Sequence, residues 1–88
     1  MYITQSDRPG KRYIAIFDNG KKVHFGSEGQ AYIDHMDKAK REAYLKRHAK
    51  NENWNDPYTA GALSRWILWG ESTNINKNIS DFKKRFGL

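Results

Sequence analysis

The chain contains no cysteine, so no disulfide can hold it together and its fold must rest on apolar side chains. These are few but large, because hydrophobic residues make up 38% of the 88 residues and Phe, Trp and Tyr make up 14%. Disordered tails are usually poor in aromatic residues. The longest apolar run, residues 66–69, is far shorter than the roughly 20 residues of a membrane span. The composition therefore predicts one small domain over residues 1–88, with no membrane partner, in a reducing intracellular compartment.

Residues 11–25 carry the pattern of a β-hairpin. The pair Asn19-Gly20 tolerates the positive φ angles of a two-residue type I′ turn, and apolar residues alternate on both sides of it. A loop centred on this pair predicts a buried face made of Ile14, Ile16, Val23 and Phe25. It leaves the opposite, open face to Tyr13, Ala15, Phe17, Lys22 and His24. Residues 1–10 either add a short strand at positions 2–4 or remain loosely ordered.

Two helices are predicted in the middle of the chain. Residues 34–50 contain no Gly or Pro and are rich in good helix formers, with Asp34 as a cap. Asp56 followed by Pro57 is a strong start signal for a second helix, which is expected to run to Trp69 and to stop at Gly70. The small and apolar residues of this second helix predict that it forms the centre of the core.

The clearest periodicity lies at the end of the chain. Apolar residues recur there at helical spacing on one face, at Ile75, Ile79, Phe82 and Phe86. Thr73 or Asn74 can cap this helix and Gly87 can end it. The fold class predicted from all four segments is α+β, an N-terminal β-hairpin or small antiparallel sheet followed by three helices.

Motifs for catalysis or metal binding are lacking in the sequence. The three histidines, His24, His35 and His48, show no metal-ligand spacing, and there is no cysteine to complete a zinc site. Acidic residues near predicted helix starts are explained by capping and by the helix dipole. We therefore expect no enzymatic activity, no metal and no cofactor. The catalytic alternative is a small enzyme accessory that would bring His24 and His48 into one cleft.

Positive charge is the strongest functional signal. The net charge is +6, from 16 basic and 10 acidic residues, and the excess is concentrated in the first and last predicted helices. If these helices face the same way, they form a surface for nucleic-acid phosphates or for an acidic protein. The predicted binding residues are Lys38, Arg41, Lys46, Arg47, Lys50, Lys83, Lys84 and Arg85.

The tryptophans divide into two groups. Trp66 and Trp69 belong to the most apolar helix, so core packing is the favoured interpretation for both. Trp54 lies in the polar loop 51–55 and is the candidate for stacking on a base. No set of Arg, Asn and Gln side chains suited to reading bases is visible, so binding is expected to be independent of nucleotide sequence.

Several segments resemble a family of small basic proteins encoded by large DNA viruses of algae and amoebae. These segments are residues 20–26, 44–48, 53–57, 59–69 and 81–86, and the resemblance spans residues 11–88. It implies a viral protein, carried in the virion as a minor capsid component or present in the infected host cell. Its partner there would be a capsid protein or the packaged nucleic acid. The resemblance transfers no catalytic residue and leaves the oligomeric state open.

Overall fold

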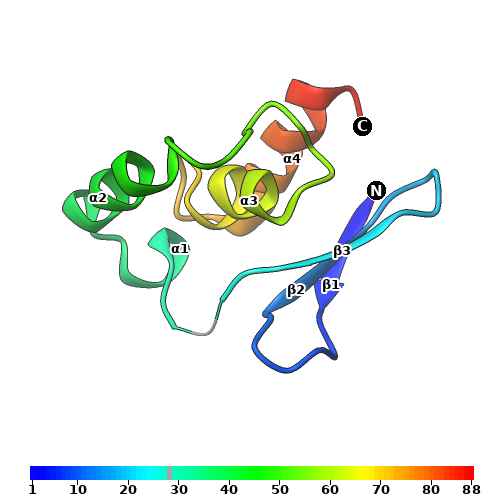
Figure 1. The fold of residues 1–88 in the computed structure, drawn as a ribbon, viewed down its shortest axis with the longest axis horizontal. Coiled ribbons are helices and arrows are strands. Elements are labelled where there is room, and N and C mark those ends of the chain that lie inside the picture. Colours follow the sequence, from blue (N-terminus) through cyan, green and yellow to red (C-terminus); the bar gives the residue numbers. More distant parts are fainter. Residues whose placement is uncertain (28) are drawn as a thin grey trace.

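The computed structural model describes residues 1–27 and 29–88. A three-stranded antiparallel sheet of order β1-β2-β3 comes first, and the helices follow it. The strands are β1 (Tyr2–Gln5), β2 (Tyr13–Ile16) and β3 (Lys22–Phe25). The helices are α1 (Tyr32–His35), α2 (Lys38–His48), α3 (Ala60–Leu63), the π-helix η1 (Ser64–Leu68) and α4 (Ile75–Phe86). The helices lie to one side of the sheet, with α3 between α2 and α4 (Figure 1). The predicted α+β fold is confirmed, with a small sheet rather than a lone hairpin.

The predicted register of the hairpin is wrong by one residue. The loop has three residues, Asp18 to Gly20, and is closed by a hydrogen bond of 2.9 Å from the backbone N–H of Phe17 to the carbonyl of Lys21. A type I′ turn needs positive φ at both central residues. Here Gly20 has φ +88° whereas Asn19 does not lie in that region, which is the pattern of a three-residue loop with a bulge.

This shift exchanges the two faces of β2. Ala15 pairs with Val23 instead of Ile16, and Tyr13 pairs with Phe25. Because successive side chains point to opposite faces, a one-residue slip turns a whole strand over relative to its partner. The buried face is therefore built on Ala15 and Phe25, and the prediction that Ile14 and Ile16 form it is wrong.

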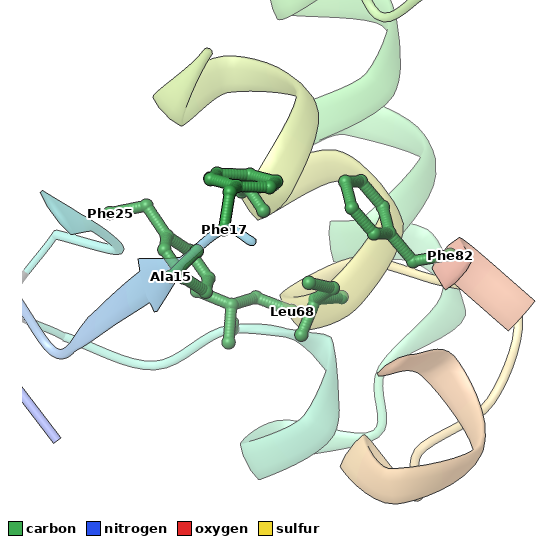
Figure 2. Packing of buried hydrophobic residues seen from close by; sticks show 8 residues of the cluster. Ala15, Phe17, Phe25, Leu68 and Phe82 are labelled. Atoms are coloured by element: carbon green, nitrogen blue, oxygen red, sulfur yellow. The ribbon is translucent and has the colours of Figure 1, made fainter. Parts of the chain in front are cut away.

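The core forms where this sheet face meets α3, η1 and α4. Figure 2 shows Ala15, Phe17 and Phe25 from the sheet side meeting Leu68 and Phe82 from the helices. Other members of the cluster are Ala31, Leu63 and Ile67. The predicted apolar face of α4 is confirmed, since Ile75, Ile79 and Phe86 pack against the same cluster. Of the two predicted caps, Thr73 and Asn74, it is Asn74 that caps α4, and Gly87 ends the helix with φ +65° as predicted.

The helix predicted over residues 34–50 is broken in two. Met36 adopts the left-handed conformation with φ 58° and ends α1. Asp37 then caps α2, where its carboxylate accepts hydrogen bonds from two backbone N–H groups of the first turn. Asp34, the predicted cap, lies inside α1 instead. No local breaker such as Gly or Pro marks this boundary, which is why helix propensity alone does not reveal it.

The next helix also differs from the prediction. It begins at Ala60, because Thr59 rather than Asp56 is its N-cap. From Ser64 onward the backbone is π-helical, and the N–H of Trp69 donates to the carbonyl of Ser64 at 2.9 Å. A π-helical turn is wider than an α-helical one and is rare, often marking a functional site.

A buried asparagine on α4 is hydrogen-bonded to the backbone of η1 and of the loop after it. The Asn78 side chain is 2% exposed, and its Nδ2 donates to the carbonyls of Ile67 at 2.9 Å and Ser72 at 2.7 Å. Its Oδ1 accepts from the N–H of Ser72 at 3.2 Å. Gly70 lies against this amide so closely that a Cβ placed there would be 2.7 Å from Asn78 Cγ. One side chain thus satisfies three backbone groups at the end of η1.

Replacing this residue should destabilise the fold strongly. Asn78→Ala leaves the backbone groups of Ile67 and Ser72 without partners, and each unsatisfied buried group costs about 1–3 kcal/mol. We expect the free energy of unfolding to fall by about 3 kcal/mol in urea denaturation. Asn76→Ala, an exposed position on the same helix, is the matched control and should change it by less than about 0.5 kcal/mol.

An ion pair joins the sheet to α1. The Arg12 guanidinium donates to both oxygens of Asp34, at 2.6 and 3.1 Å, and the Asp34 carboxylate also accepts from the N–H of Ala31 at 2.7 Å. The hydrogen bond from Arg12 holds the pKa of Asp34 below its ordinary value of 3.8, although burial opposes the shift. Both side chains remain partly exposed, so the pair contributes modestly.

This pair predicts an acid-sensitive component of stability. Because the folded-state pKa of Asp34 is lowered, its stabilisation is complete above about pH 4 and is lost as the pH falls through the folded-state value. Asp34→Asn should therefore cost about 1 kcal/mol at neutral pH, and the difference from the wild type should shrink on acidification. The control Asp7→Asn, in the exposed turn before β2, should show no such pH-dependent loss of stability. If the free energy of unfolding of Asp34→Asn differs from that of the wild type by the same amount at every pH, the ion pair is not the source of the acid sensitivity.

Candidate anion-binding site

The predicted basic residues are distributed over two helices with α3 between them (Figure 1). Those of the first group lie on α2 or just after it, and those of the second lie in the last turns of α4. Within residues 1–27 and 29–88, no carboxylate lies within 4.0 Å of any of the eight. Neighbouring acids therefore do not neutralise these cations by direct contact in the described part of the chain.

Two of these residues are brought together by a third arginine, Arg65 of η1. The Nη1 of Arg65 donates to the carbonyl of Trp69 at 3.2 Å, and the Nε of Arg41 donates to the same oxygen at 3.2 Å. The Cζ atoms of Arg65 and Arg85 lie 4.2 and 3.7 Å from the centroid of the Trp66 ring. Arg41, Arg65 and Arg85, from α2, η1 and α4, thus form what we call the arginine row.

The electrostatics of the row are unfavourable without a partner. Burial lowers the pKa of Arg65, and the charges of Arg41 and Arg85 lower it further, whereas Glu71 raises it. The Nε–H of Arg65 is buried and has no acceptor among the described residues. A guanidinium keeps its proton under all ordinary conditions, so the cost appears as lost hydration and like-charge repulsion. An anion bound to the row would relieve both.

The tryptophans hold the arginines in place. Trp66 lies against Arg65 and Arg85, and its Nε1 donates to the carbonyl of Trp54 at 2.8 Å. The Trp54 centroid is 5.1 Å from Arg65 Cζ, and the indole Nε1 donates to Glu52 at 2.9 Å. A guanidinium stacked on an aromatic ring keeps the N–H groups along its edge for hydrogen bonds. Trp54, the predicted stacking residue, is thus partly buried and tied to its neighbours by its edge.

A stack of rings joins α2 to the end of η1. Tyr44 is buried and lies parallel to Trp69, with centroids 4.1 Å apart and an interplanar angle of 1°. His48 stacks on the same tyrosine at 4.2 Å. Burial raises the pKa of Tyr44 far above its usual value, and the charge of Glu52 adds to the shift. The predicted packing role of Trp66 and Trp69 is confirmed, because both lie against the core cluster.

The remaining predicted cations lie outside the row. The charge of Lys83 is a minor contribution to the lowered pKa of Asp18 in the hairpin loop. Arg47 lines a cavity of about 320 Å³ between the sheet side and the helices, together with Lys11 and His48. Lys38, Lys46 and Lys50 are exposed on or just beyond α2, and Lys84 is exposed on α4. Of the eight predicted residues, Arg41 and Arg85 are those whose charges act on Arg65.

The two histidines of the catalytic alternative have separate partners. His24 lies on the face of β3 that alternates with the buried Phe25, and its Nδ1 is 2.7 Å from the Ser6 hydroxyl. The Nδ1 of His48 is 3.2 Å from Glu52 on the helical side of the molecule. The hydrogen-bond partners of the two imidazoles thus come from different parts of the fold, Ser6 after β1 and Glu52 after α2.

Two further findings concern other classes of site. Within the described ranges, no group of three or more His, Asp or Glu side chains is placed to hold a metal ion. None of the helices in that part of the chain combines the length and the apolar composition needed to cross a bilayer.

Sequence reasoning missed Arg65, although a signal was present. It is a lone charged residue inside the most apolar stretch of the chain, residues 62–69. Such residues are almost never fully buried without a partner, so an arginine at this position indicates either an ion pair or an anchored surface cation. The structure shows the second arrangement in the residues it describes, with Trp54 and Trp66 as the anchors.

Repulsion within the row predicts a specific response to salt. Added sodium chloride screens the like charges, so the wild type should gain about 0.5 kcal/mol in the free energy of unfolding from this source. Arg85→Gln removes one member of the row and should reduce that gain, measured by urea denaturation at low and high salt. Lys22→Gln removes the same charge from the far face of the sheet and should retain it; equal losses in both variants would mean that only net charge matters.

The comparisons with known proteins extend over the first half of the fold. A family model described as a family of unknown function, DUF5754, matches residues 1–48. These residues include the sheet, α1 and α2, with Arg41, and exclude η1 and α4. No curated protein and no solved structure matches the chain. Since the match covers more than half of the 88 residues, the chain belongs to the DUF5754 family of unknown function.

Proposed function

We propose that the chain is a non-catalytic binding module for the phosphate backbone of nucleic acid. The observation that carries this proposal is the arginine row, in which Arg65 and Arg85 lie over Trp66 and Arg41 shares the Trp69 carbonyl with Arg65. No carboxylate within the described ranges lies within 4.0 Å of any of the three. A planar guanidinium without a carboxylate partner can donate two parallel hydrogen bonds to two oxygens of a tetrahedral phosphate group.

A protein partner of acidic character is the second interpretation, and the apolar surface disfavours it. Interfaces between proteins usually have an apolar centre surrounded by polar residues. The large hydrophobic side chains that the structure exposes, within the residues it describes, are Tyr2, Met36 and Leu88. None of them belongs to the arginine row or to the tryptophans that hold it, so the row itself contributes no exposed apolar centre of this kind.

The tryptophans support contact with phosphates rather than with bases. Arg65 and Arg85 both lie over Trp66, and Arg65 also lies over Trp54. Rings engaged in this way are poor platforms for stacked bases, which supply much of the affinity in single-strand binding proteins. Phosphate contacts fix position without reading sequence, so the proposed module binds nucleic acid irrespective of its sequence.

The setting of this module follows from the resemblance to proteins of large DNA viruses. In that setting, the chain is a minor virion component that contacts packaged nucleic acid. The same surface would serve a nucleic-acid-binding protein that has no role in the virion. Crosslinking of the chain to its neighbours in purified virions would distinguish these two settings.

Binding should depend steeply on salt concentration. Each neutralised phosphate of duplex DNA contributes about −0.9 to the slope of log K against log salt, so a row of three arginines predicts a slope of about −3 or steeper. Arg85→Gln should reduce the magnitude of the slope by about 1, measured by fluorescence anisotropy with a labelled duplex. Lys22→Gln is the matched control and should leave the slope nearly unchanged.

Other results would contradict the proposed nucleic-acid function. If the wild type does not bind duplex or single-stranded DNA even at low salt, the nucleic-acid proposal fails. Binding of polyglutamate under those same conditions would then favour the acidic protein partner. A slope that falls equally in Arg85→Gln and Lys22→Gln would show that the arginine row is not the binding site.

A further inference from the structure

We infer that the arginine row is a binding site for a doubly charged phosphate monoester, with Arg65 at its centre. The inference rests on the proposed function and narrows it to the end of a nucleic-acid strand, where a terminal phosphate is a monoester. Free inorganic phosphate shares this chemistry, and the experiments below distinguish the two sources.

The charge of the row favours a dianion. Arg41, Arg65 and Arg85 contribute three positive charges, and Glu71 is the acid whose charge acts on Arg65. A phosphodiester carries one negative charge, whereas a phosphate monoester carries about 1.5 to 2 at neutral pH. One diester would leave most of the repulsion among the three guanidiniums in place. A monoester would compensate for most of the excess charge at a single point.

The row is already ordered in the absence of an anion. Arg65 is held by the carbonyl of Trp69 and lies over two indoles, 5.1 Å from the Trp54 centroid and 4.2 Å from that of Trp66. The Nε of Arg41 is held by the carbonyls of Trp69 and Gly70. Binding therefore does not have to order Arg41 and Arg65, whose immobilisation would otherwise cost affinity.

Several donors of the row remain available. The two Nη groups of Arg41 and the whole guanidinium of Arg85 have no hydrogen-bond acceptor within residues 1–27 and 29–88. Arg65 contributes its Nη2, which has no acceptor there either, whereas its Nε–H is buried and its Nη1 is bonded to Trp69. Unsatisfied donors on neighbouring guanidiniums match an acceptor with several oxygens, such as the phosphate group.

Acidic residues at one side of the row favour an end group over a continuing strand. Arg85 and Trp66 border a cavity of about 500 Å³ that Glu71, Asp81 and Lys84 also line. The two carboxylates would repel a second phosphate that followed the first into this cavity. A strand that ends at the row avoids this repulsion, since its backbone leaves away from the carboxylates.

The first experiment uses inorganic phosphate alone. Trp54 and Trp66 contact Arg65, so their fluorescence should change when phosphate occupies the proposed binding site. We expect a saturable change with sodium phosphate in the wild type that sodium chloride at equal ionic strength does not produce. Arg65→Gln should abolish the change and Lys22→Gln should retain it. Arg41→Gln and Arg85→Gln should weaken it, and Arg85→Gln, at an exposed position, provides the test if Arg65→Gln does not fold.

The second experiment compares two oligonucleotides of identical sequence, one with a 5′-phosphate and one with a 5′-hydroxyl. We expect the wild type to prefer the phosphorylated strand about tenfold, which corresponds to roughly 1.4 kcal/mol. In Arg65→Lys the charge is kept but the planar fork is lost, so the preference should fall to nearly one while salt-dependent binding of both strands persists.

The outcomes separate this inference from the proposed function. If the wild type binds both strands equally, the inferred binding site for a terminal phosphate is contradicted, whereas the proposed binding of the nucleic-acid backbone is not. Suppose instead that neither strand binds but inorganic phosphate still changes the fluorescence in an Arg65-dependent way. The binding site is then supported for free phosphate, and the proposed nucleic-acid function is contradicted. If inorganic phosphate produces no specific change in tryptophan fluorescence, the inferred phosphate-binding site itself is contradicted.

Discussion

The packing of one short helical segment, residues 60–68, between the sheet and α4 is the constraint on which the rest of the structure depends. Its inner side contributes Leu63, Ile67 and Leu68 to the core, where all three are buried. A buried side chain of this size contributes about 1.5–3 kcal/mol relative to an exposed one. A domain of this size has no second core to compensate for losing such contacts. The same packing turns Arg65 and Trp66 toward the surface.

The π-helical turn and Asn78 give this segment its particular shape. A π-helix leaves backbone groups in unusual positions at its end, and these need partners when buried. Asn78 of α4 supplies a partner for the carbonyl of Ile67 in η1, and it also bonds both backbone groups of Ser72 in the loop that follows. The C-cap residue of this turn, Trp69, has a carbonyl that accepts from both Arg41 and Arg65. The geometry of the arginine row is thus a consequence of how the core is closed, which couples the candidate site to the stability of the fold.

The sequence predicted the structure best where the signal was local and periodic. The apolar face of α4, from Ile75 to Phe86, and its caps at Asn74 and Gly87 were all correct, because helical spacing and capping depend on neighbours along the chain. Prediction failed at the hairpin, where Asn19-Gly20 fits two kinds of loop and a difference of one residue inverts β2. It also failed at Met36, whose left-handed conformation no local sequence pattern indicated.

For the candidate site, the sequence by itself determined that the chain has an excess of cations, that two helices carry most of it, and that the fold class is α+β. Only the tertiary structure decided which cations meet. Arg41, Arg65 and Arg85 are far apart along the chain, and their approach depends on how η1 packs between α2 and α4, a long-range arrangement that residue spacing within any single helix does not contain. The face of β2 that became buried was likewise decided by pairing and packing, because both of its faces carry apolar side chains.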